Sequence, residues 1–332
     1  MVTDHQQLAG MFWADFNQRM GQSKGIQMGF DLDTLITRID GLEELSLPFT
    51  DSEVDAVIKN MPTDRAPGPD GFTGLFLKKC WPILKEDFMK LVQEFYEGKC
   101  NLECLNTSLI TLIPKKLSPE YVGDFRPISL TNTCLKFLTK LLANRLQGVI
   151  LKCIHRNHYG FLRCRSIQDC LAWCFEYIHQ CKASKRPIIL LKHDFTKALD
   201  TIEHELILRI LKCKGFDDRW TSWIDSILST GSSSVLLNGV PRNHFVCRSG
   251  VRQGDPLSPL LFVIAVDLLQ SVVNEMCSRN ILTLPILTAS RDYPIVQYVD
   301  DTLMVLPAID NQLIAFIDMV DVGDKSPSLR EN

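Results

Sequence analysis

The sequence lacks several features that would assign a chain of this length to a common class. Its 12 cysteines are scattered singly and form no CxxC pair, which argues against a zinc site and a disulfide framework. The longest apolar run, Leu260 to Leu269, is interrupted by Asp267 and is shorter than the roughly 20 residues that cross a bilayer. The first residues show no basic segment followed by an apolar core, so no secretory signal is expected. These absences favour a reduced, intracellular protein that does not contact a membrane.

The sequence also lacks internal repeats, low-complexity segments and a regular alternation of strands and helices. Residues 1–48 show no strong hydrophobic period, and we expect a poorly ordered linker there. Hydrophobic patterns predict strands and helices elsewhere without a βαβ rhythm, which is typical of an α+β fold. The predicted strands are 109–114, 187–195, two within 233–247, and a hairpin at 295–306; the predicted helices are 50–61, one following Pro82, 132–150, 166–181 and 256–277.

Charge is nearly balanced over the whole chain but not along it. With 36 basic and 39 acidic residues the net charge is −3, which gives no sign of a polyanion partner. Residues 99–165 contain eleven Lys and Arg against three acids, a local net charge of +8, whereas residues 26–60 contain eight acids and two bases. A basic middle segment on a near-neutral chain suits a groove for nucleic acid. A solvated helix face is the simpler alternative.

The string IVQYVDDTLMVL places two adjacent carboxylates, Asp300 and Asp301, inside a predicted apolar hairpin. Such a pair is costly to desolvate unless something neutralises it. Divalent cations would do so, because Mg²⁺ takes oxygen ligands and is often held by one or two carboxylates and substrate phosphates. Another predicted strand end supplies further carboxylates, Asp194 and, six residues on, Asp200. Taken singly, an Asp-Asp pair is more often a surface turn.

Two further strings place polar and basic groups at strand and helix ends. SGVRQGDPLSPLLF is a glycine-rich turn that runs into a helix, with Arg252 and Gln253 at the turn. LITLIPKK and DFRPISL place Lys115, Lys116 and Arg126 beside a predicted buried strand, and such side chains bind triphosphates well. Either cluster alone is equally consistent with an ordinary turn and solvated charges.

In this order the motifs resemble the reverse transcriptase of LINE-type (non-LTR) retrotransposons, plant lineages especially. The strings that carry the resemblance are APGPDGF, LIPKK, DFRPISL, GFLRCRSIQD, LKHDFTKALDTIEHE, GVRQGDPLSPLLF and YVDD, and they extend over residues 49–312. The resemblance implies a right-hand polymerase fold with fingers at 49–185 and a palm at 186–312. It implies an RNA template, a DNA primer and a dNTP as partners.

The resemblance also assigns roles to individual residues. Asp194, Asp300 and Asp301 would be the catalytic residues and would hold two Mg²⁺ ions, with Mn²⁺ as a substitute. Lys115, rather than its neighbour Lys116, and Arg126 would meet the incoming triphosphate.

Four further positions complete the implied site. Gln253 would line the nucleotide and template pocket, Arg165 would touch the template, and Tyr298 would lie by the primer end. Leu199 stands where the family has a large aromatic residue that excludes a ribose 2′-OH, so discrimination against ribonucleotides should be weaker.

Other positions depart from the family pattern. His193 replaces an aliphatic residue, His158 replaces a glutamine, and Cys164 replaces a glycine, where a Cβ would strain a turn that needs a positive φ. Residues 313–332 look like a divergent polar tail, so we expect the thumb to be missing and expect no endonuclease before the domain. We therefore expect a truncated copy of a retroelement polymerase with impaired or lost activity.

Two alternatives compete with a reverse transcriptase of this type, for which a nuclear location is expected by resemblance. The first is a non-catalytic remnant that only binds nucleic acid. The second is another metal-dependent enzyme on a similar hairpin, such as a nucleotidyl cyclase, which would leave Lys115, Arg126 and Gln253 without a role.

Overall fold

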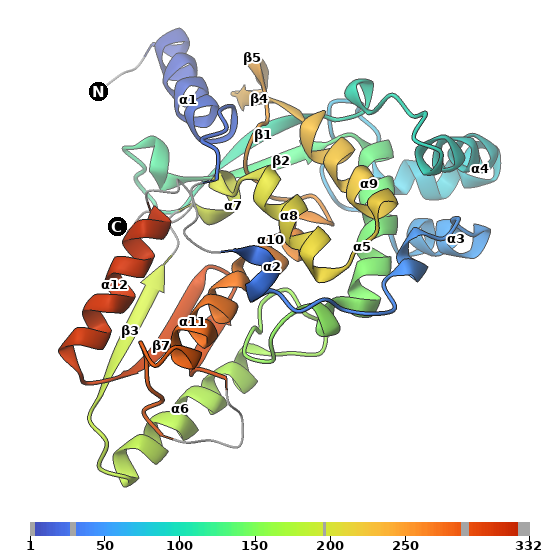
Figure 1. The fold of residues 1–332 in the computed structure, drawn as a ribbon. Helices are drawn as coiled ribbons and strands as arrows, with labels where there is room; N and C mark the ends of the chain where they lie inside the picture. The colour runs from blue at the N-terminus through green and yellow to red at the C-terminus, as the bar shows by residue number, and fades with distance from the viewer. Residues whose placement is uncertain (1–3, 27–30, 195–196, 287–291, 325–332) are drawn as a thin grey trace.

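Two separate sheets organise the chain in the computed structural model, which describes residues 4–26, 31–194, 197–286 and 292–324 (Figure 1). The first sheet has the strand order β2-β1-β4-β5, and the second has the order β3-β7-β6. All neighbouring strands are antiparallel except β1 and β4, which are parallel. The strands are β1 (Thr107–Pro114), β2 (Phe125–Thr131), β3 (Ile188–Asp194), β4 (Ser232–Leu237), β5 (Val240–Val246), β6 (Ile295–Tyr298) and β7 (Asp301–Pro307).

Helices surround both sheets, so the mixed architecture confirms the predicted α+β class. They are α1 (His5–Met20), α2 (Leu32–Leu35), α3 (Asp51–Asn60), α4 (Gly74–Tyr96), α5 (Thr133–Cys153), α6 (Ile167–Ala183), α7 (Ala198–Thr201), α8 (His204–Lys214), α9 (Asp218–Ser229), α10 (Ser258–Val266), α11 (Leu268–Ser278) and α12 (Asp310–Asp324). Three short 3₁₀ turns, η1 (Glu43–Ser46), η2 (Leu102–Cys104) and η3 (Val122–Asp124), join them. The predicted boundary at 185/186 does not separate the two sheets, because β4 and β5 belong to the sheet of β1 and β2.

The largest core lies among helices α3, α4, α5, α8, α9 and α10, with Phe137, Trp220 and Phe262 fully buried. The stretch Ser258–Ser278 is long and apolar enough to cross a membrane by length and composition alone, a test that core helices also pass. Here 61% of its most apolar window is buried inside the protein, and α10 and α11 meet at a buried Asp267. Both observations are typical of a core helix.

The prediction of a poorly ordered linker over residues 1–48 is wrong for much of that segment. The carboxylate of Asp4 accepts hydrogen bonds from two backbone N–H groups and caps α1. Phe12, Phe16 and Met20, spaced four residues apart, bury one face of α1 against the sheet of β1, β4 and β5 (Figure 1). The apolar spacing is present in the sequence, but its helical amphipathicity is weak because alanine, glycine and methionine interrupt the polar face.

Two other boundaries differ from those predicted. Helix α4 starts at Gly74 behind the Thr73 cap and runs through Pro82, so it begins eight residues before that proline. The segment predicted as a polar tail from residue 313 continues α12 as far as Asp324, and Phe316 is buried against the β7 side of the second sheet. Residues 313–324 are mostly apolar, and tertiary burial of part of this surface, with Phe316 inside, supports the helix.

Candidate active site

The two adjacent carboxylates lie where β6 turns into β7. Tyr298 pairs with Asp301 across the hairpin, so Val299 and Asp300 form a two-residue turn. Val299 has φ 59°, a left-handed conformation that is costly for a β-branched residue. Asp300 and Asp301 are both exposed. The strained turn therefore presents two carboxylates to solvent, which is the arrangement expected of a functional hairpin.

The edge strand β3, which pairs with the central strand β7, brings the backbone of the third predicted site residue, Asp194, to the same end of the sheet. Strands β3 and β7 pair residue for residue from Ile188 to Asp194, and Asp194 stands directly opposite Asp301. The side chain of Asp194 lies outside the described part. Within the described part, no group of three His, Cys, Asp or Glu residues forms a metal-ligating cluster. The Lys192 ammonium lies 2.8 Å from the Asp301 carboxylate in an exposed ion pair, as a monovalent counter-charge at this edge.

A loop from the middle of the chain is built against the carboxylate turn. The N–H of Tyr159 donates to the carbonyl of Gln297 (2.8 Å), and the Gln297 N–H donates to the carbonyl of Asn157 (3.0 Å). A Cβ on Gly160 would lie 2.4 Å from the backbone nitrogen of Val299. Only glycine fits there, so the loop and the turn are fixed to each other.

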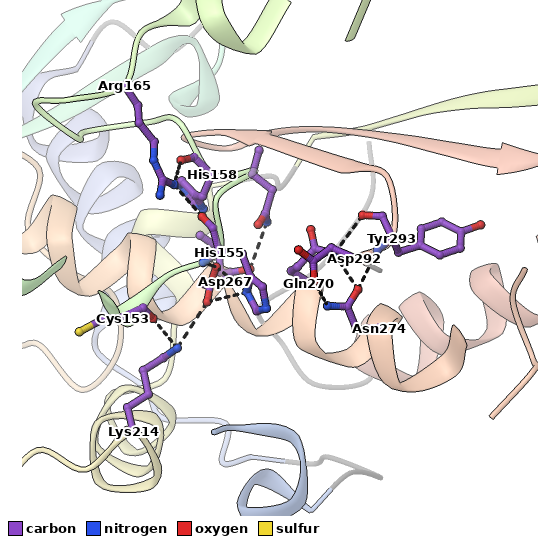
Figure 2. Close-up of polar contacts among 12 residues, drawn as sticks. Cys153, His155, His158, Arg165, Lys214, Asp267, Gln270, Asn274, Asp292 and Tyr293 are labelled. Carbon is purple, nitrogen blue, oxygen red and sulfur yellow. Dashed lines mark hydrogen bonds and ion pairs between the residues drawn. The ribbon is translucent and has the colours of Figure 1, made fainter. Parts of the chain in front are cut away.

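Arg165 holds this loop together from inside. Its Nη1 donates to the carbonyls of His155 (2.6 Å) and His158 (2.5 Å), and Figure 2 shows it folded back over the loop. Its predicted contact with a template stays a prediction. His158 is fully buried, and neither ring nitrogen has a hydrogen-bond partner in the described part of the chain. Burial lowers the pKa of His158 to about 4, against the opposing charge of Asp267.

Asp267 is the centre of a buried polar cluster at the junction of α10 and α11 (Figure 2). His155 Nδ1 lies 3.1 Å from its carboxylate, and Lys214 Nζ lies 3.4 Å from it and 2.5 Å from the carbonyl of Cys153. Burial acts to raise the pKa of Asp267, but the His155 hydrogen bond and the Lys214 charge outweigh it and lower the pKa. This cluster ties α5, α8 and α10 together behind the site.

The predicted strain at Cys164 is absent. Cys164 is exposed, and its described backbone is not among the positive-φ residues; Phe161, three residues earlier, has φ 60° instead. The turn places its left-handed residue at another position, so a Cβ at residue 164 is tolerated. The sequence pattern identified the turn but not which residue carries the unusual conformation.

The two lysines that follow β1 are separated by their contacts. The Lys116 ammonium lies 2.9 Å from the Asp124 carboxylate and over the ring of Tyr121. Lys115 is exposed, and among the described residues its side chain forms no hydrogen bond or ion pair. Arg126 is exposed on β2, opposite Ile113 of β1, so it lies beside the end of the strand that carries Lys115. Of the two lysines, only Lys116 has a described side-chain partner, and the nucleotide-binding role of Lys115 stays a prediction.

The turn that carries Gln253 contacts the first sheet on one side and the α7 segment after β3 on the other. The Gln253 carbonyl accepts from the N–H of Ser129 on β2 (2.7 Å), and the next residue, Gly254, has φ 111°. On the other side, the N–H of Val251 donates to the carbonyl of Leu199 (2.6 Å), which follows β3. Leu199 is half-buried against the main core. The turn therefore contacts β2 of the first sheet and the α7 segment that follows β3, and Leu199 and Gln253 lie close together.

Asp200 does not join the other carboxylates. Its side chain is 3% exposed and accepts hydrogen bonds from Arg19 Nη1 (2.7 Å) and Gln253 Nε2 (3.0 Å). Burial raises the pKa of Asp200, and the Arg19 charge and the Gln253 hydrogen bond oppose that rise. The sequence does not predict Arg19 as a site residue. It lies in the segment predicted to be a linker, and nothing in its local sequence indicates a distant partner.

Comparison with known proteins assigns the chain to a family. Residues 113–325, more than half of the chain, match the family described as "Reverse transcriptase (RNA-dependent DNA polymerase)". A Xenopus laevis protein, "Transposon TX1 uncharacterized 149 kDa protein", is 26% identical over 79% of this chain and 20% of its own length. The Pol polyprotein of the R2 retrotransposable element of Popillia japonica is 28% identical over 66% of this chain and 30% of its own length. An apo telomerase structure from Candida tropicalis shares 16% identity with a TM-score of 0.48, covering 77% of this chain and 53% of that one.

The chain belongs to the reverse transcriptase family and is similar to the polymerases of non-LTR retrotransposons. By family it is an RNA-directed DNA polymerase domain, and its mixed helix-and-sheet fold is consistent with the fingers and palm of such a polymerase. The chain spans less than a third of the curated relatives it matches first. These relatives are animal proteins, so the plant lineage stays a prediction.

Proposed function

We propose that this chain copies an RNA template into DNA by adding dNTPs to a primer 3′-OH. The observation that carries the proposal is the register of the second sheet, which sets Asp194 opposite Asp301 with Asp300 on the adjoining turn. Three acidic residues whose backbones meet at one end of this sheet, two of them exposed, are suited to divalent cations and poorly suited to a purely structural role.

The donor set at this edge fits magnesium, because all three groups are carboxylates and two of them are solvent-exposed. Asp194, Asp300 and Asp301 would hold two ions, Mg²⁺ or Mn²⁺. When bound, such ions lower the pKa of a hydroxyl nucleophile and stabilise the charge on transferring phosphates. The Lys192 ammonium is ion-paired with Asp301 in this structure. Cations bound to Asp301 would replace this ion pair.

The other sheet supplies the groups that hold the nucleotide. Lys115 and Arg126, exposed and side by side at the β1–β2 edge, would bind the triphosphate by charge-assisted hydrogen bonds. Gln253 and Leu199 would line the base and sugar pocket, since the turn that carries Gln253 is hydrogen-bonded to Leu199 in α7. Tyr298, which precedes the strained turn, would lie by the primer end, and the loop that Arg165 fixes would support the template.

Primer extension tests the proposal directly. Purified chain should extend oligo(dT) on poly(rA) in Mg²⁺ or Mn²⁺, and Asp301→Asn should abolish extension while leaving binding of the duplex intact. Asp310→Asn, an exposed acidic residue at the start of α12, is the matched control and should extend like wild type. A chain that neither extends the primer nor binds the duplex would contradict the proposal.

Two observations favour the alternative of a non-catalytic nucleic-acid-binding remnant. Leu199 stands beside the Gln253 turn where the family has an aromatic residue, and Lys192 forms an exposed ion pair with Asp301. Under this alternative, the logarithm of the RNA-binding constant would fall linearly with the logarithm of the salt concentration. Binding would survive Asp300→Ala, whereas wild type would show no primer extension.

We propose the nucleus of a plant cell as the place of action. This proposal rests on motif resemblance, and the location of a tagged chain tests it.

A further inference from the structure

Three side chains from distant parts of the sequence form one hydrogen-bonded chain beneath the Gln253 turn. Arg19 lies at the end of α1, Asp200 lies in α7, and Gln253 lies between β5 and α10. Arg19 Nη1 donates to one oxygen of Asp200 (2.7 Å), and Gln253 Nε2 donates to the other (3.0 Å). The N-terminal helix is thereby connected through a single carboxylate to the turn that carries the pocket amide.

This carboxylate determines which way the Gln253 amide points. One oxygen of Asp200 accepts from the Arg19 guanidinium and the other accepts from Gln253 Nε2, so the NH₂ group of Gln253, and not its carbonyl oxygen, faces Asp200. Asp200 is buried with a 3% exposed side chain, and Gln253 is half-buried. The Oε1 atom is therefore directed away from Asp200 in a fixed orientation.

The backbone around Asp200 keeps the three groups in place. A Cβ on Gly250 would lie 2.5 Å from the carbonyl oxygen of Asp200, so the turn packs directly on α7. The hydroxyl of Ser249 donates to the carbonyl of Arg19 (2.8 Å), which fastens the end of α1 to the same turn. The Arg19 guanidinium also lies 4.4 Å from the ring centroid of Phe16. These contacts leave the guanidinium little freedom to turn elsewhere.

We propose that Asp200 and Arg19 are positioning residues that orient the Gln253 amide for the incoming nucleotide. The inference rests on the proposed function, because it requires that Gln253 contacts the nucleotide. Asp200→Asn would present both a donor and an acceptor to Gln253, so the amide could flip and the pocket would lose its fixed polarity. Loss of one oriented hydrogen bond corresponds to roughly a three- to tenfold weaker Kd.

A double-mutant cycle tests this inference. The measurement is the Kd of dTTP for the full chain bound to poly(rA) with a dideoxy-terminated oligo(dT), in Mg²⁺. Asp200→Asn and Gln253→Met should each weaken dTTP binding, and the double variant should be no weaker than Gln253→Met alone. Arg19→Met should weaken binding in the same way, and Arg19→Lys should recover part of it by retaining the charge.

The matched control is Glu53→Gln, which makes the same carboxylate-to-amide change at an arginine-paired carboxylate in the distant helix α3. It should leave the Kd of dTTP unchanged. Independent, additive effects of Asp200→Asn and Gln253→Met would overturn the inference, as would an unchanged Kd in Asp200→Asn. If circular dichroism shows that Asp200→Asn does not fold, the two Arg19 variants, each alone and combined with Gln253→Met, decide the matter by the same criterion. Wild-type chain that binds the duplex but no dTTP would contradict the proposed function itself, a result distinct from the others.

Discussion

The imidazole of His158 makes the fold sensitive to acid in a way that can be measured. His158 is fully buried, both ring nitrogens lack hydrogen-bond partners among the described residues, and its pKa is lowered to about 4 by burial. The unfolded chain binds a proton at the ordinary histidine pKa, whereas the folded chain resists it. The contribution of His158 to folding stability is therefore fully present above the pKa of the unfolded chain. It is lost as the pH falls toward the pKa of the folded chain.

The size of the effect follows from the two pKa values. The folded value of about 4 lies below the reference of 6.5. Proton linkage then removes about 2 kcal/mol of unfolding free energy between pH 7 and pH 5, and about 3 kcal/mol by pH 4. His158→Gln removes this contribution, because glutamine does not titrate. The stability of the variant relative to wild type should rise by about 2 kcal/mol on going from pH 7 to pH 5.

Urea unfolding at pH 7 and pH 5 measures this difference, because subtraction cancels the other titrating groups that both proteins share. His179→Gln on α6 is the control: it replaces an exposed imidazole and should leave the difference at zero. An equal stability difference between wild type and His158→Gln at both pH values would refute the reasoning, since it would mean that His158 is protonated as readily in the folded chain as in the unfolded one.

Three further predictions concern Lys115, Leu199 and Gly160. Lys115→Ala should weaken dTTP binding about tenfold, whereas Lys116→Ala, whose ammonium is already ion-paired, should change the Kd less than twofold; equal effects would reverse the assignment. Leu199→Tyr should raise the preference for dTTP over UTP in primer extension by about tenfold, and an unchanged ratio would exclude residue 199 from the sugar pocket. Gly160→Ala should cost about 1–3 kcal/mol in urea unfolding, because its Cβ would press on the backbone of Val299.

Much of the local structure could be predicted from the sequence, because it depends on near neighbours. The capping box of Thr50 and Glu53 forms as its spacing predicts. The Asn238-Gly239 turn connects β4 and β5, with both residues at positive φ. The same holds for the YVDD hairpin, where strand-forming residues flank the turn. Each of these features needs only residues a few positions apart.

The predictions from sequence are wrong where contacts between distant segments determine the backbone conformation. Helix α1 gains its stability by burying Phe16 against a sheet whose strands lie more than 80 residues away. The positive φ at Phe161, and not at Cys164, depends on how the loop packs on the β6–β7 turn. A single sequence contains no local signal of either contact.

The sequence by itself determined the chemical inventory: the carboxylates at Asp194, Asp300 and Asp301, the basic residues after β1 and the amide at Gln253. Their types and order along the chain suffice for that, since each is part of a short motif. Only the tertiary structure decided which side chains are available. It pairs Lys116 with a neighbouring carboxylate and leaves Lys115 exposed; it withdraws Asp200 from the carboxylate edge and places it between Arg19 and Gln253. The physical reason is that burial and pairing depend on contacts between residues that are far apart in the sequence, 181 positions for Arg19 and Asp200, which no local pattern encodes.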